Sequence, residues 1–179
     1  MAKRSPKNYG QWLILGGLIL LLGLLQASLF QFWTFFRIKP DLVLIFVVAM
    51  ALLRPFRQGL WLGMMGGLLL DLFSGRYLGL HIFSKMIVAF GIGAVREYVY
   101  KENYFVPFVA TFIGTVIDQG VYLTLASFFG LVVFRPEALT EVILPAAFYN
   151  SILTLFIYFR LVHLDHYLRE LESRYPLAS

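Results

Sequence analysis

Ionisable and amide side chains lie inside the apolar segments of this chain, where they can act only as partners, ligands or structural contacts. They include Asp71, His81, Lys85, Asp118, Gln119 and Asn150. Each costs free energy in a membrane unless it faces a cavity, another helix or a partner. His81 and Lys85 are four residues apart and therefore share one face of a helix. We expect Lys85 to pair with Asp71 or Asp118, and His81 and Asn150 to form interhelical hydrogen bonds.

The spacing of Asp71 and His81 suggests a second contact. A short turn between Phe73 and Tyr77 brings both residues to a similar depth, so we expect Asp71 to be held by Lys85 or His81. An alternative is that some of these polar side chains line a ligand cavity or contact a partner's helix. A proton or ion relay is a weaker interpretation, because such a pathway normally uses more than two buried acids.

No group of residues has the spacing of a known catalytic site. Ser84 and His81 have the wrong helical offset for a serine nucleophile and its base, and no Gly-x-Ser-x-Gly turn is present. The His-Glu-x-x-His helix of metalloproteases is absent. His163 and His166 have a weak metal-like spacing around Asp165, but a solvated tail helix explains them better. The sequence predicts a protein that is not an enzyme and that uses no metal or cofactor.

The composition places these side chains in a membrane. Hydrophobic residues make up 60% of the chain and charged residues 14%, and the mean hydropathy is +0.78, well above that of a soluble domain. The net charge of +5 fits the enrichment of Lys and Arg at cytoplasmic helix ends. No basic run is long enough for a nucleic-acid patch. The sequence contains no cysteine, which excludes disulfides and thiolate metal sites.

The apolar runs predict an all-α integral membrane protein with a six-helix transmembrane bundle. A bilayer core of roughly 30 Å needs about 20 helical residues, and shorter runs span where flanking Lys or Arg reach the interface. The expected spans are residues 12–36, 38–53, 59–73, 78–95, 104–133 and 139–162, in one domain of residues 1–162. We expect the first to be an uncleaved helix rather than a signal peptide. The second and third are short enough to form a re-entrant hairpin instead, and Pro145 is expected to kink or break the sixth.

Loop charges orient this topology with both termini in the cytoplasm. With the N-terminus inside, ten basic residues lie on the cytoplasmic side: Lys3, Arg4, Lys7, Arg54, Arg57, Arg96, Lys101, Arg160, Arg169 and Arg174. Four lie outside: Arg37, Lys39, Arg76 and Arg135. An excess of Lys and Arg on the cytoplasmic side is the strongest topological signal in membrane proteins.

A glycine stripe on the third span suggests a partner-binding face. Gly59, Gly63 and Gly67 are four residues apart, so they lie on one side of a helix and let another backbone approach closely. We expect this stripe to receive a helix of a partner protein.

The C-terminal residues 163–179 predict a cytoplasmic amphipathic tail. From residue 160 onward, Leu161, Leu164, Leu168, Leu171 and Tyr175 recur at helical intervals with charged residues between them. Two interpretations stay open at this point. The tail lies on the inner leaflet, or it docks to a cytoplasmic protein.

Three motifs in residues 38–97 resemble the family of the rod shape-determining protein MreD. These are Pro40-Asp41-Leu42, the glycine-rich run from Gly63 to Gly75 that includes Leu68-Leu69-Leu70-Asp71, and Leu78-Gly79-Leu80-His81. The chain length, basic N-terminus, hydropathy and short loops are similar as well. The last two spans resemble the family in hydropathy alone.

The resemblance implies a non-enzymatic membrane scaffold of the bacterial cell-elongation machinery in the cytoplasmic (inner) membrane. Such proteins bind the bitopic protein MreC. Through MreC they associate with MreB, with RodA and with a class B penicillin-binding protein, which together support rod shape and lateral peptidoglycan synthesis. Membrane lipids are further expected partners, and nucleic acid is not.

The resemblance also leaves a second function open. Six-helix members of this kind are similar in outline to the substrate-binding subunits of energy-coupling-factor transporters, so a vitamin-like ligand is the alternative. A shared fold does not choose between the two functions. A ligand-binding subunit needs a deep outer pocket with converging polar groups, whereas a scaffold needs an exposed lateral groove.

Overall fold

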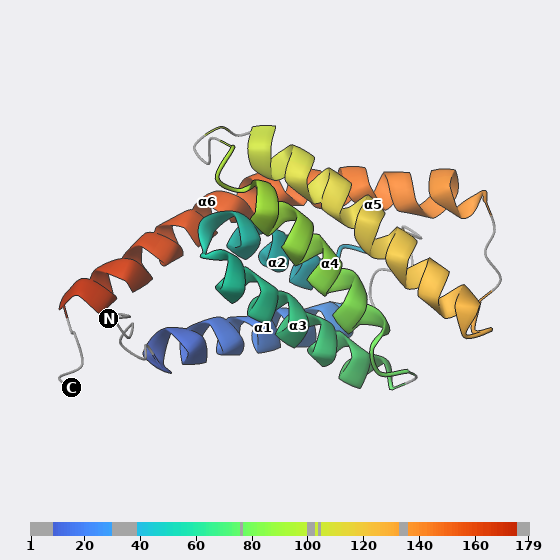
Figure 1. Ribbon diagram of the computed structural model, residues 1–179, viewed down its shortest axis with the longest axis horizontal. Helices are drawn as coiled ribbons and strands as arrows, with labels where there is room; N and C mark the ends of the chain where they lie inside the picture. Colours follow the sequence, from blue (N-terminus) through green and yellow to red (C-terminus); the bar gives the residue numbers. More distant parts are fainter. Residues whose placement is uncertain are drawn as a thin grey trace.

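In the described part of the chain, six α-helices form one bundle (Figure 1). The computed structural model describes residues 9–29, 39–75, 77–99, 103, 105–132 and 136–174. The helices are α1 (Tyr9–Leu29), α2 (Leu42–Leu53), α3 (Phe56–Ser74), α4 (Leu80–Val95), α5 (Phe105–Phe128) and α6 (Leu144–Arg174), and the π-helical turn η2 (Leu139–Ile143) directly precedes α6. These ranges contain no strand. The predicted all-α bundle is therefore confirmed.

Within the described ranges, three helical segments are long and apolar enough to cross a membrane. They are Gly10–Ser28, Phe105–Phe128 and Leu139–Glu170. Helices α2 and α4 are apolar but have only 12 and 16 residues, which correspond to about 18 and 24 Å. The chain is thus a membrane protein, while the crossing of the bilayer by all six helices stays a prediction. Several predicted features lie outside the described residues, namely residues 30–38, 104 and 133 of the spans and Lys3, Arg4, Lys7, Arg37, Arg76, Lys101 and Arg135.

Helix α2 forms the centre of the bundle. Every residue from Val43 to Leu53 is buried, as expected for a helix that is apolar on all sides. The flanking residues set its ends. The Asp41 carboxylate accepts a hydrogen bond from the Leu44 amide at 2.8 Å and caps the first turn. Pro55 ends the helix, because proline disfavours helical geometry in the residue before it.

The glycine stripe of α3 is covered by α2 and α4. Gly59, Gly63 and Gly67 are all buried. A Cβ atom added to Gly59 would lie 3.1 Å from the Ala51 Cα atom of α2, and one added to Gly67 would lie 2.5 Å from the Ile82 Cα atom of α4. The expected close backbone approach is present, but the prediction that this stripe receives a partner's helix is wrong. The protein's own helices occupy the space.

A polar cluster joins α6 to the inner ends of α1 and α2. We use "inner" for the ends that the loop charges predict to be cytoplasmic. Arg54, which follows α2, pairs with Asp165 of α6. Asp165 also accepts a hydrogen bond from Arg169 Nε at 2.8 Å, and Arg169 Nη2 donates to the Leu53 carbonyl at 2.7 Å. Arg54 Nη1 donates to Gln11 Oε1 of α1 at 2.6 Å. In Figure 1 the N-terminal end of α1 and the C-terminal end of α6 lie at the same end of the molecule.

The predicted amphipathic tail is a continuation of α6, which is one helix as far as Arg174. Leu161 and Leu168 are buried against the bundle, and the Leu168 carbonyl accepts a hydrogen bond from Gln11. Both interpretations of the leucine face, the inner leaflet and a cytoplasmic protein, are therefore wrong for these two residues. Residues 175–179 and the Leu171 side chain lie outside the described part of the chain.

Pro145 disturbs the sixth helix without breaking it. The residue lies in the first turn of α6, immediately after the π-helical turn η2. Proline has no N–H to donate to the carbonyl four residues earlier, and a widened turn accommodates the missing bond. The two halves of the predicted sixth span are therefore continuous.

Candidate functional site

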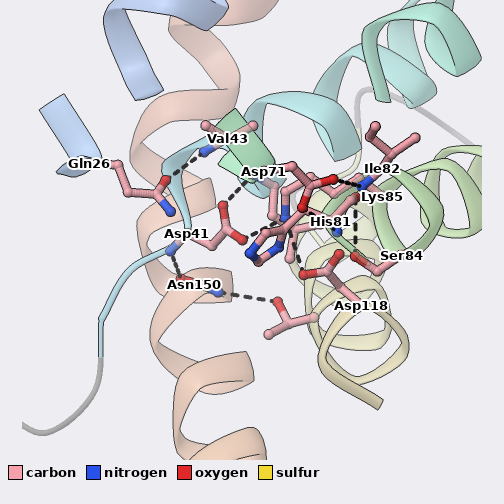
Figure 2. A network of polar contacts seen from close by, with 12 residues as sticks. Gln26, Asp41, Val43, Asp71, His81, Ile82, Ser84, Lys85, Asp118 and Asn150 are labelled. Carbon is pink, nitrogen blue, oxygen red and sulfur yellow. Dashed lines mark hydrogen bonds and ion pairs between the residues drawn. The ribbon is translucent and has the colours of Figure 1, made fainter. Parts of the chain in front are cut away.

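Lys85 of α4 is the centre of a buried ion cluster (Figure 2). Its side chain is 0% exposed. Its Nζ atom lies 2.7 Å from Asp41 Oδ2 and 3.2 Å from Asp118 Oδ2 of α5. The predicted pairing of Lys85 with Asp118 is confirmed, and Asp41 is an additional partner. A buried ammonium group that contacts two carboxylates meets the requirement that buried charges be paired.

Amide side chains extend this cluster to α1 and α6. The Asn150 Oδ1 atom accepts a hydrogen bond from the Asp41 amide at 3.0 Å, and the Asn150 Nδ2 atom donates to Thr115 of α5 at 3.4 Å. The Gln26 side chain of α1 accepts from the Val43 amide at 3.2 Å. The predicted interhelical role of Asn150 is confirmed. Together with the Lys85 ion pairs, these contacts join five helices around the start of α2.

Asp71 caps α4 rather than pairing with a charged side chain. Its carboxylate accepts three main-chain hydrogen bonds, from Gly79 at 2.7 Å, His81 at 3.0 Å and Ile82 at 3.2 Å. These amides belong to the start of α4, where N–H groups have no partner within the helix. The prediction that Lys85 or His81 holds Asp71 is confirmed for His81, which donates its main-chain amide. Lys85 pairs with Asp41 and Asp118 instead.

A polar pocket lies next to Asp71 and His81 at the ends of α3, α4 and α5. The charge distribution assigns this end of the bundle to the outside, and we call the cavity the outer pocket. It has a volume of about 550 Å³, and its polar lining comes from Asp71, Ser74, Tyr77, His81 and Tyr122. The His81 ring stacks on Tyr122 with 4.6 Å between the ring centroids. Its Nδ1 atom is buried and has no hydrogen-bond partner among the described residues.

The sequence predicts five residues of this region, Asp71, His81, Lys85, Asp118 and Asn150, but not Asp41 as an ion-pair partner or Tyr122 as a ring contact. Asp41 was recognised only as part of a motif, although an aspartate directly before an apolar run is a helix start signal. No sequence signal marks Tyr122, because nothing in its neighbours distinguishes a tyrosine that lines a pocket from one that packs in the bundle. Two of the motifs that carry the family resemblance meet in space, since Asp71 accepts hydrogen bonds from the Gly79 and His81 amides. The third motif is joined to α4 through the Asp41–Lys85 ion pair.

The arrangement is suited to holding helices together. The Asp41 and Asp118 carboxylates contact the Lys85 ammonium group, and the Asp71 carboxylate contacts backbone amides. Among the described residues, no three His, Asp or Glu side chains gather in a way that could hold a metal ion. His163 and His166 are both exposed, whereas Asp165 between them is buried in its ion pairs.

Comparison with known proteins identifies the family. No curated protein and no solved structure matches the chain significantly. A family model described as rod shape-determining protein MreD matches residues 7–162, which include α1 to α5, the first part of α6 and the whole ion cluster. The chain therefore belongs to the family of the rod shape-determining protein MreD and has a role in determining rod shape.

Proposed function

We propose that this protein is a non-enzymatic scaffold of the bacterial cell-elongation machinery that crosses the cytoplasmic (inner) membrane several times. In this role it binds MreC, and through MreC it associates with MreB, RodA and a class B penicillin-binding protein during lateral peptidoglycan synthesis. Its family is one of shape-determining proteins and not a known family of enzymes. The observation that supports the scaffold most strongly is that Lys85 is fully buried and ion-paired.

The outer pocket is the surface that we assign to MreC. The glycine stripe of α3 is filled by the protein's own helices, so it offers no room for a partner. The outer pocket combines polar groups with apolar residues such as Leu131, and Tyr77 at its rim is 52% exposed. Exposed aromatic side chains beside a cavity are typical anchors of protein interfaces. A bitopic protein has chain outside the membrane that can reach this pocket.

Blocking the pocket should separate MreC binding from folding. Ser74 lies in the outer pocket, and Ser28 at the outer end of α1 is exposed but does not line it. We expect Ser74→Trp to reduce copurification of MreC by about tenfold or more, because the indole fills the cavity. Ser28→Trp should leave copurification unchanged. Equal recovery of MreC with both variants, at equal membrane insertion, argues against this surface.

The outer pocket is also large enough for the second candidate function, the binding of a vitamin-like ligand. Its volume of about 550 Å³ lies within the range of about 300–1,000 Å³ for small-molecule sites. If the protein is a substrate-binding subunit of an energy-coupling-factor transporter, mass spectrometry of the purified wild type should find a vitamin-sized molecule that Ser74→Trp excludes. If it is a scaffold, no such molecule copurifies, and MreC is lost instead.

A further inference from the structure

An apolar groove runs between α4 and α5 and reaches the C-terminal end of α2 at Leu52. It has a volume of about 510 Å³. Its lining includes Leu52 of α2, Val88, Ile92 and Val95 of α4, and Val109 and Ile113 of α5, and all of its lining residues are apolar. Gly91 also lines the groove, and the space where its Cβ atom would lie is open. The groove is therefore an unfilled channel along the side of the bundle.

The length of the groove fits one leaflet of the bilayer. Along α5 its lining extends from Phe105, the first residue of the helix, to Ile117. Twelve helical steps cover about 18 Å, which is close to half of a hydrocarbon core of roughly 30 Å. A partner's transmembrane helix needs a contact surface through both leaflets. A lipid acyl chain needs a surface through one.

Arginines lie at the inner end of the groove. Leu52 and Val95 line the groove, and Arg54 and Arg96 follow them closely in the sequence. The two arginines meet there, because Arg96 Nη1 donates to the Arg54 carbonyl. Arg169 is adjacent, since its side chain donates to the Leu53 carbonyl.

The charges around this end favour an anion. The acids nearby are Asp165, which pairs with Arg54 and Arg169, and the exposed Glu97, which lies 3.4 Å from Arg96. Among the described residues at this end, three arginines stand against two carboxylates. The Arg54 side chain is 3% exposed and contacts Asp165 and Gln11. The Arg96 side chain is 17% exposed and is therefore the one that a phosphate can reach.

We propose that the groove binds one acyl chain of an anionic phospholipid from the cytoplasmic leaflet, with the lipid phosphate at Arg96. The apolar lining accepts the chain, and its length selects one leaflet. The excess of arginine selects a negatively charged headgroup over a neutral one. This inference goes beyond the scaffold function, because it needs no protein partner.

Native mass spectrometry tests both parts of the lipid site. The full-length protein in detergent is mixed with equal amounts of phosphatidylglycerol and phosphatidylcholine, and the bound lipids are counted. We expect phosphatidylglycerol to be retained about tenfold better. Gly91→Leu should reduce that binding by about tenfold, because the side chain fills the groove. Gly17→Leu on α1, where the Cβ position is also open, is the matched control and should bind as the wild type does.

A separate variant tests the contact between the lipid headgroup and Arg96. Arg96→Gln should remove the preference for phosphatidylglycerol while some lipid stays bound, and Arg160→Gln, an exposed arginine on α6, should keep the preference. Equal binding of the two lipids by the wild type overturns the proposal, as does equal loss in Gly91→Leu and Gly17→Leu. If Gly91→Leu retains lipid but loses MreC, the groove is a protein interface and the proposal is wrong. If Arg96→Gln fails to fold, the comparison of Gly91→Leu with Gly17→Leu still tests the proposal.

Discussion

Replacing Lys85 by Met is expected to destabilise the protein by about 3–5 kcal/mol. Lys85 is 0% exposed, and its ammonium group is the cation that contacts both Asp41 and Asp118. Met fills a similar volume but leaves two buried carboxylates without their ion-pair partner. Thermal unfolding in detergent, followed by gel filtration, measures the loss. Arg160→Met, at an exposed position of α6, is the control and should behave as the wild type does.

A double variant separates the ion pair from simple loss of packing. Asp118→Asn in the Lys85→Met background removes one of the uncompensated charges, so it should recover part of the lost stability. If Lys85→Met is as stable as the wild type, the ion cluster does not hold the bundle together. If the double variant is no better than the single one, Asp118 is not coupled to Lys85.

The second large effect is expected at Gly67. A Cβ atom there would lie 2.5 Å from both the His81 carbonyl oxygen and the Ile82 Cα atom, which are backbone atoms that cannot rotate away. Gly67→Leu should therefore push α3 and α4 apart and lower stability by about 3 kcal/mol or more. The same thermal assay measures the effect.

The matched control for this change is Gly17→Leu. A Cβ atom at Gly17 meets nothing within 4 Å, so leucine should be tolerated there and should favour the helix over glycine. Wild-type stability of Gly67→Leu would mean that α3 and α4 do not pack as closely as described.

The sequence predicts an ion-pair partner of Lys85 correctly, but it does not predict which helix covers the glycine stripe of α3. Glycines four residues apart require a close neighbour, but the spacing does not say whether that neighbour is a partner or the chain itself. The structure shows α2 and α4 beside Gly59 and Gly67. The pairing of Lys85 is easier to predict, because a lysine in an apolar helix must find an acid and Asp118 is one of two acids in the neighbouring spans. Asp41 is not predicted as its partner, because it lies at the polar start of the span 38–53, where its type and position indicate only a helix cap.

The inner end of α6 was harder to predict. Leucines at helical spacing indicate an apolar face, but they do not say what covers it. The Arg54–Asp165 ion pair that holds this face inward joins residues far apart in the sequence. From the sequence, Asp165 can be related only to its neighbours His163 and His166, because local spacing does not reveal contacts between distant residues.

Photo-crosslinking in rod-shaped cells tests the binding of MreC at the outer pocket most directly. A photoreactive phenylalanine analogue replaces Tyr77 at the rim of the pocket in one variant and the exposed Ser28 of α1 in another. A crosslink to MreC from position 77, and a much weaker one from position 28, is the predicted result. Efficient crosslinking of MreC at position 28 with none at position 77 would contradict it.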